Sequence, residues 1–444
     1  MDNPNPIVKY YISGISEPFT EKSSLWDMPL LGKDAGGILL HEYFTLAEQF
    51  ISADNYYILQ QGLAFILKEE VKSQNIGQIY IEEIKQIDIY LEKHGAFYHP
   101  ARVEVGIKIG NSIQIEFPIC FVLNTAVSAH GLALINNEYR ILKYLSKIDD
   151  NFFVPQVFGV KSITYRGIEI SFLLGTWFDG YKEFHLTDKS NSDTHSYPDI
   201  NNIEGSSLIH IWNSNGTVIP IYSPSYFQIY EKASEILTYF YNLETSEAIE
   251  LWHHAAGDFV VKQTIDGFDV KLITVRDYSS NYVPVSSSDS SDSSEYVEQD
   301  NNLSENIAQE SILSNNVEQD VYNALLLFFL NLTLRMRIDR IDGIGRRSLV
   351  DNAVIPFILR GFFRGIKNKK IPDVIQNYFI ENSLVNGFQS YLSQFSHENL
   401  YQIYLIMLGD CQTDSPERDF ILKHLQEHSE ALYCNISEGI FSIS

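Results

Sequence analysis

Two aspartates, Asp258 and Asp277, stand nineteen positions apart at the ends of a segment with the pattern of a β-hairpin. Two apolar, strand-like runs in this segment bracket a short turn at Asp266–Gly267. One carboxylate is therefore expected at the entry of the hairpin and the other at its exit, where both could face one cleft. Phosphoryl transfer needs such a pair, because one acid orients or deprotonates the attacking hydroxyl and another holds Mg²⁺ against the phosphates. Acids at hairpin ends are also common turn formers.

The segments before the hairpin predict a small sheet with one helix. Alternating apolar residues at 87–91 and 103–109, followed by a longer apolar run at 113–127, predict three strands in an antiparallel meander. Residues 134–145 have the periodicity of an amphipathic helix, and a strand pair is expected at 163–174. The chain thus predicts sheet, one helix and more sheet, in that order.

Helical periodicity dominates on either side of these strands. Apolar residues at three- and four-residue steps over 38–72 predict one or two helices before the sheet. Further helices are expected at 224–243, leading into the hairpin, at 321–338, and over most of 370–444. We therefore predict an N-terminal helical extension over 1–83, a small β-rich lobe over 84–175 and a large, mainly helical lobe over 176–444.

The segment His254-Ala-Ala-Gly-Asp258 resembles the His-Gly-Asp catalytic loop of the aminoglycoside phosphotransferase and choline kinase branch of the protein-kinase-like fold. The resemblance implies that Asp258 is the catalytic base, with Gln263 at the position of the family's Mg²⁺-binding Asn and Asp277 as the second metal ligand. It also implies that His254 packs or hydrogen-bonds near the metal site. A metal site formed by His253, His254 and Asp258 is a less favoured alternative, because adjacent histidines in a turn rarely chelate one ion.

The resemblance further implies a phosphate-gripping lysine paired with an acid on the small-lobe helix. Glu138 occupies the helix position, with a solvated surface glutamate as the alternative. The lysine itself is absent from the third strand, where Asn124 stands at the expected place. Lys108, on the polar face of the preceding strand, is the candidate replacement, with a solvated strand residue as the alternative.

Composition limits the classes of partner. The 444-residue chain has a formal net charge of −25, which argues against binding to a nucleic-acid backbone. The longest apolar run, Ala324–Leu334, contains Asn331 and is too short to span a bilayer. The three cysteines have no metal-ligand spacing, and the N-terminus has no signal pattern, which favours a reducing cytoplasm.

Two charged segments have alternative interpretations. Residues 279–320 contain twelve Ser, nine Asp or Glu and no Lys or Arg, so we predict a disordered insertion, either a tolerated surface loop or a regulated phospho-acceptor. Seven arginines lie between 335 and 364. They either form salt bridges with the acids of the large lobe or form an anion-binding patch.

These observations predict an α+β protein of bilobal, kinase-like architecture. The leading functional hypothesis is an ATP- and Mg²⁺-dependent phosphotransferase that acts on a hydroxyl of a small molecule or protein, with Asp258 as base. The alternative is a catalytically inactive pseudokinase that serves as a binding or scaffolding module. Nucleotidyl transfer is a distant third. The expected partners are a nucleotide and an unidentified phosphoryl acceptor, without nucleic acid or membrane, and the sequence carries no signal for an oligomeric state.

Overall fold

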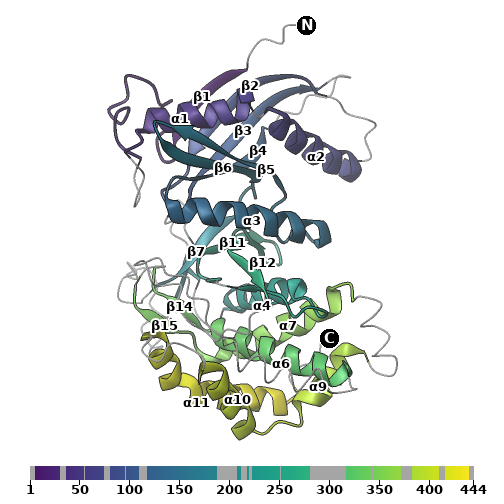
Figure 1. Ribbon diagram of the computed structural model, residues 1–444. Coiled ribbons are helices and arrows are strands. Elements are labelled where there is room, and N and C mark those ends of the chain that lie inside the picture. Colours follow the sequence, from purple (N-terminus) through teal and green to yellow (C-terminus); the bar gives the residue numbers. More distant parts are fainter. Residues whose placement is uncertain are drawn as a thin grey trace. The chain divides into compact units, whose positions relative to one another are not determined.

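The protein, represented by a computed structural model, is an α+β chain that divides into two compact units, residues 1–179 and 180–444 (Figure 1). The structure describes residues 6–30, 37–54, 56–74, 81–95, 97–109, 118–187, 208–211, 218–219, 223–250, 252–280, 317–342, 345–371, 383–409 and 416–439. Within these ranges, none of the helices is both long and apolar enough to cross a bilayer.

A six-stranded sheet organises the first unit. In chain order this unit contains β1 (Ile7–Ile12), α1 (Leu40–Glu48), the π-helical turn Gln49–Asp54, α2 (Tyr56–Gln74), β2 (Ile81–Leu91), β3 (His99–Ile109), β4 (Ile119–Ala126), α3 (Ala129–Ile148), β5 (Val157–Tyr165) and β6 (Ile168–Thr176). The strands lie in the order β1-β2-β3-β4-β6-β5. The pairs β2–β3 and β3–β4 are antiparallel, so the predicted meander is confirmed. The first strand, β1, pairs in parallel with β2, which makes the sheet mixed.

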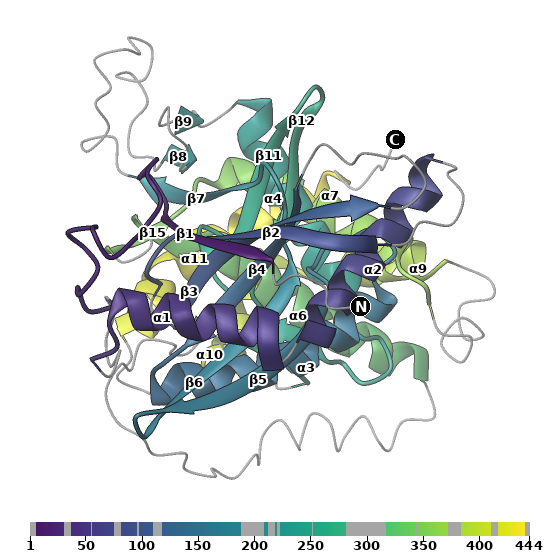
Figure 2. The same ribbon diagram turned by 90° about the horizontal axis from the view of Figure 1, so that it is seen from above.

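Alternation along β3 and β4 places their most buried residues on one face of the sheet, whereas β6 is buried on both faces. On β3, Val103 and Val105 are fully buried, whereas the residues between them are only partly covered. The apolar faces of α1 and α2 pack against this face, in one cluster with Phe121 and Phe172. Figure 2 views this face from above, with α1 crossing the strands. The helices within 1–83 are therefore part of the same core as the sheet.

Helix α3 packs against β4, β5 and β6. Its N-terminus is capped by the Ser128 side chain, whose oxygen accepts the Gly131 N–H at 3.0 Å. Ile135, Glu138 and Leu142 follow one another at helical spacing and are all buried. Because Glu138 is only 1% exposed, the alternative of a solvated surface glutamate is wrong.

The second unit combines short sheets with a group of helices. In chain order it contains β7 (Lys182–Thr187), β8 (Leu208–Ile211), β9 (Val218–Ile219), α4 (Pro224–Phe240), β10 (Ala248–Glu250), β11 (Ala256–Thr264), β12 (Gly267–Leu272), β13 (Asp277–Ser279), α6 (Val317–Arg335), β14 (Ile338–Arg340), β15 (Arg347–Leu349), a 3₁₀ turn at Asn352–Val354, α7 (Ile355–Asn368), α9 (Leu384–Leu392), α10 (His397–Gly409) and α11 (Pro416–Ser437). One sheet has the order β12-β11-β7-β8-β9, and β10–β13 and β14–β15 form separate two-stranded pairs.

The acidic, serine-rich segment predicted to be a disordered insertion at 279–320 falls largely outside the described residues, which resume at 317. Its first residue, Ser279, ends β13, and its last four residues begin α6. The predicted disorder and the predicted phosphorylation therefore stay predictions.

Helices α4 and α7 approach each other closely through two glycines of α7. A Cβ atom at Gly361 would overlap the carbonyl oxygen of Glu231, and one at Gly365 would lie 2.7 Å from the carbonyl oxygen of Glu235. The Ser234 hydroxyl donates to the Ile358 carbonyl at 2.7 Å across the same contact. Only glycine permits this separation of the two backbones, because a methyl group would force the helices apart.

We expect Gly361→Ala to lower the free energy of unfolding by about 1–3 kcal/mol, the usual cost of overpacking a close core contact. The matched control is Gly409→Ala at the end of α10, where a Cβ would meet nothing within 4 Å. Urea unfolding followed by circular dichroism measures both variants. Equal stability of Gly361→Ala and the wild-type protein would show that the two helices can separate at no cost.

Candidate functional site

The hairpin predicted around Asp266–Gly267 is confirmed. Strands β11 and β12 pair in antiparallel register from Phe259–Leu272 to Thr264–Gly267. Gly267 has a φ of 132°, a conformation that side chains rarely adopt, and this explains the glycine at the turn. At the other end of the hairpin the Ile273 N–H donates to the Asp258 carbonyl at 2.8 Å. Asp258 and the residues that follow Ile273 therefore lie at the same end of the hairpin.

The Asp258 side chain is 1% exposed and fully engaged with protein donors. Arg276 donates two hydrogen bonds to it, from Nη1 to Oδ2 at 2.6 Å and from Nη2 to Oδ1 at 2.5 Å. The backbone N–H of His253 also donates to Oδ2, at 2.7 Å. Such a bidentate guanidinium–carboxylate pair is among the strongest polar contacts in proteins and compensates the burial of both charges.

The position of Gln263 does not suit a metal ion shared with Asp258. Both residues lie on β11, five residues apart, and a strand rises about 3.3 Å per residue, so their backbones are about 16 Å apart. Gln263 is exposed near the turn, whereas Asp258 is buried at the base of the hairpin. One ion could not touch both side chains. The metal-binding role of Gln263 stays a prediction.

Asp277 lies on β13, directly opposite Glu250 of β10. Its Oδ2 accepts a hydrogen bond from the Ser279 hydroxyl at 2.9 Å. Burial raises the pKa of Glu250 to about 7, with the nearby Asp277 carboxylate acting in the same direction and Arg335 opposing it. Asp277 thus sits next to a carboxyl group whose pKa lies well above the usual range for glutamate. Its predicted metal-binding role is not tested by this geometry.

The two adjacent histidines flank a buried acid that the sequence did not single out, Asp339 of β14. The Asp339 side chain accepts the Ala255 N–H at Oδ2 and the Arg340 N–H at Oδ1, both at 2.7 Å. His253 Nδ1 lies 3.7 Å from Oδ1, and His254 Nδ1 lies 3.2 Å from Oδ2. Asp339 therefore ties the loop at 253–255 to β14. Burial raises the pKa of Asp339, although His253 opposes the shift.

His254 is a buried packing residue. It is 1% exposed, its ring packs 5.2 Å from the ring of Tyr230, and among the described residues neither ring nitrogen makes a hydrogen bond. Burial lowers its pKa to about 3, so the ring is neutral at physiological pH. This environment agrees with the packing role expected for His254. A nucleotide-binding role for His254 stays a prediction.

Lys108 and Glu138 belong to the first unit. Lys108 is exposed near the end of β3, beyond the last β3–β4 pair at Val105–Ile119, whereas Asn124 pairs with Pro100 at the other end of this ladder. Lys108 is eight positions after Pro100, or about 26 Å along β3. Lys108 is thus remote from the place of the residue it was expected to replace. Its pairing with Glu138 stays a prediction, as does a cleft shared with Asp277.

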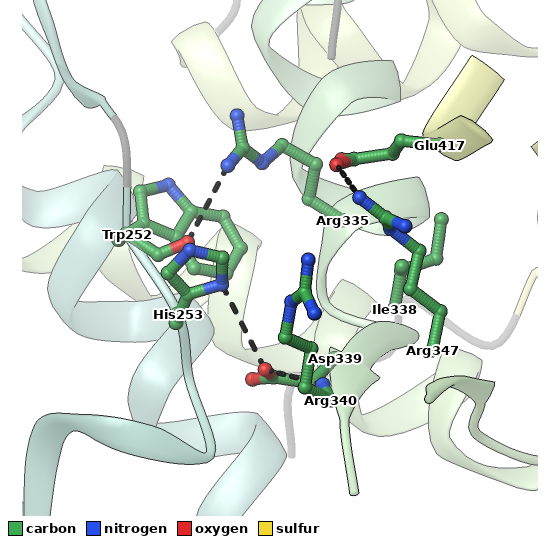
Figure 3. A pocket seen from close by; sticks show the side chains of 8 residues that line it. All are labelled: Trp252, His253, Arg335, Ile338, Asp339, Arg340, Arg347 and Glu417. Atoms are coloured by element: carbon green, nitrogen blue, oxygen red, sulfur yellow. Dashed lines mark hydrogen bonds and ion pairs between the residues drawn. The ribbon is translucent and has the colours of Figure 1, made fainter. Parts of the chain in front are cut away.

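A small pocket lies beside the loop at 252–255 (Figure 3). It is lined by Trp252, His253, Arg335, Ile338, Asp339, Arg340, Arg347 and Glu417. Its volume is about 20 Å³, room for about one water-sized group. The Arg335 guanidinium lies 5.4 Å from the Trp252 ring centre and donates to the Trp252 carbonyl at 3.4 Å. Arg347 forms an ion pair with Glu417 at 3.2 Å.

The arginine-rich segment forms the salt bridges that were one of its two predicted roles. Arg360 and Arg364 of α7 pair with Glu231 of α4, and Arg364 also approaches Glu235. Arg337 is 1% exposed, donates to the Val350 carbonyl and to His428 Nδ1 at 2.9 Å, and approaches Glu427 at 3.7 Å. Only Arg335, Arg340 and Arg347 of this segment line the pocket.

Arg276 and Asp339 are the main site residues that sequence reasoning missed. Arg276 lies at the exit of the predicted hairpin, directly before Asp277, and Asp258 lies at its entry. A basic residue opposite an acid at the ends of a hairpin was the feature of the sequence that could have predicted this ion pair. Asp339 lies 81 positions after Asp258 and carries no local signal. Only the tertiary structure brings it to the loop.

In comparisons with known proteins, no family model and no curated protein matches this chain. The resemblance to kinase-like proteins therefore rests on the residues of the chain itself.

We expect Arg276→Met to destabilise the protein by about 3–5 kcal/mol, because it leaves the buried Asp258 carboxylate without its guanidinium. The matched control is Arg360→Met, which removes a partly exposed arginine paired with Glu231 at 3.4 Å and should cost less than about 1 kcal/mol. Urea unfolding at pH 7.5 measures both. A loss for Arg276→Met no larger than the control's would mean that the buried pair is not compensating a desolvated charge.

His254 should make the protein less stable in acid. Its folded-state pKa, about 3, is below the ordinary value of 6.5, so stability is full above pH 6.5 and is lost as the unfolded chain takes up a proton. The loss is about 1.4 kcal/mol per pH unit below pH 6.5 and ends near the folded pKa. His428, whose pKa burial and Arg337 hold well below the ordinary value, adds to this loss.

Urea unfolding between pH 7.5 and 4.5 measures this pH dependence. In His254→Gln the slope of unfolding free energy against pH should fall by the equivalent of about one bound proton. His130→Gln, at an exposed position, is the matched control. Equal slopes in the wild-type protein and in His254→Gln would show that His254 takes up its proton in the folded state.

Proposed function

We propose that this chain is a kinase-like binding module that does not transfer phosphoryl groups, the pseudokinase alternative predicted from its sequence. One observation carries the proposal: the Asp258 carboxylate already accepts three hydrogen bonds, two from Arg276 and one from the His253 backbone, and is 1% exposed. A general base must reach the proton that it removes. A carboxylate held by a guanidinium and covered by protein does not.

The expected metal site gives further support. Mg²⁺ is coordinated by oxygen ligands at about 2.0–2.1 Å in near-octahedral geometry, so its protein ligands must converge on one point. The expected ligands are Gln263 and Asp277, yet Gln263 pairs with Phe268 near the turn of the hairpin, whereas Asp277 follows its other end, after Leu272. These residues do not fit a magnesium ion held as the resemblance implies. A kinase-like order of elements supports the fold assignment, with α3 after β4 and α4 before the hairpin.

The competing hypothesis is the ATP- and Mg²⁺-dependent phosphotransferase, in which Asp258 is the base, Gln263 and Asp277 bind the metal, and Lys108 with Glu138 aligns the nucleotide. Its support is the placement of Asp258 and of the segment before Asp277 at one end of the β11–β12 hairpin. On this hypothesis Arg276 would have to leave Asp258 before chemistry could begin.

The test is phosphoryl release from [γ-³²P]ATP by the full chain, with Mg²⁺ or Mn²⁺ and a panel of hydroxyl acceptors, alongside thermal shift with ATP and each metal. We expect no γ-phosphate release above that of buffer, and no metal-dependent stabilisation by ATP. Metal-dependent turnover that is lost in Asp277→Asn would overturn the proposal. The less buried Asp277 is used for this variant because Asp258→Asn would leave Arg276 unpaired and could unfold the protein.

A further inference from the structure

Three arginines surround the pocket of Figure 3 in a protein whose net charge is −25. Arg335 comes from the last turn of α6, Arg340 from β14 and Arg347 from β15. Glu417 is the lining carboxylate that pairs with one of them, Arg347. The other lining acid, Asp339, is buried, and each of its oxygens already accepts a backbone N–H. Among the lining residues, three arginines thus accompany two carboxylates, and Arg335 also approaches Glu250, outside the lining, at 4.0 Å.

Two of these arginines are held next to each other by the backbone. In the β14–β15 ladder Arg340 lies directly opposite Arg347, in the pairing that also joins Asp339 to Ser348. Directly opposite residues have Cβ atoms about 4.5–5.5 Å apart, and like charges at such positions are unfavourable. Burial lowers the pKa of Arg340, and Arg347 acts in the same direction, while Glu417 opposes the shift. An anion between the two guanidiniums would turn this repulsion into attraction.

The remaining walls restrict what that anion can be. The Trp252 ring and the Ile338 side chain line the pocket together with the polar groups, and the volume of about 20 Å³ holds about one water-sized group, the size of a single phosphoryl oxygen. A compact oxyanion at the end of a larger ligand suits this shape. Guanidinium groups recognise such oxyanions through paired N–H donors, in the geometry that phosphate and carboxylate share.

We propose that Arg335, Arg340 and Arg347 form a binding pocket for a phosphomonoester group. The doubly charged phosphoryl oxygens satisfy more than one guanidinium at once, which a singly charged carboxylate does less well. The Trp252 ring and the His253 imidazole bound the pocket on the side of the loop. This proposal goes beyond the binding function proposed above and does not rest on it, because it holds whether or not the chain transfers phosphoryl groups.

Isothermal titration calorimetry of the full chain with inorganic phosphate and with O-phospho-L-serine tests the pocket. L-serine, which lacks the phosphate group, and acetate, which offers only a carboxylate, are the controls. We expect saturable binding of both phosphate probes and none of L-serine, with acetate at least about tenfold weaker. Arg340→Gln should weaken phosphate binding by at least about tenfold. Arg360→Gln, which removes an arginine outside the pocket, should change it less than about twofold.

Arg335→Lys is the second variant, because it keeps the charge and the fold but removes the planar pair of donors. It should also weaken phosphate binding, and near-ultraviolet circular dichroism checks that each variant is folded. Equal weakening by Arg340→Gln and Arg360→Gln, or binding that does not saturate, would overturn the proposal in favour of a general attraction of anions. Glucose 6-phosphate and a phosphoserine peptide, titrated in parallel, distinguish a metabolite from a phosphorylated protein as the source of the group.

Discussion

Burial of the Asp258 carboxylate is the constraint on which the geometry of the candidate site depends. A charge removed from water is costly unless the protein supplies an opposite charge and hydrogen-bond donors. Arg276 supplies both, and the His253 N–H supplies a further donor. Since Asp258 begins the hairpin and Arg276 follows its end, this ion pair closes the base of the hairpin. It also fixes where the loop at 252–257 lies.

A second buried carboxylate holds the other side of that loop. Asp339 is buried, accepts the Ala255 N–H and lies within 3.7 Å of both histidine rings. Two buried carboxylates from different parts of the chain therefore hold one short loop from two sides. Burial lowers the pKa of both histidines between them, although Asp339 and Asp258 oppose the shift at His253.

This arrangement separates the two kinds of charge at the site. The acids that could serve phosphoryl transfer are buried or paired, whereas three arginines line the neighbouring pocket. This separation agrees with the proposed anion pocket, because the Asp258 carboxylate is held by Arg276 and guanidinium groups line the pocket. The order of helices and strands can persist while the chemistry changes, since packing depends on apolar periodicity and catalysis on a few polar contacts.

Local patterns in the sequence determined most of the elements. The meander of β2, β3 and β4, the hairpin at Asp266–Gly267 and helices α3, α4 and α6 follow from periodicity and turn residues, which act over a few positions. The parallel strand β1 was missed because it pairs with a strand about eighty residues later. For the same reason the sequence predicted Asp258 as a catalytic base and gave no sign of its ion pair. Arg276 lies eighteen positions away and Asp339 lies eighty-one away, and only folding brings them into contact with Asp258 or its loop. Whether a carboxylate is reactive or neutralised depends on partners distant in sequence, so the tertiary structure alone decided it.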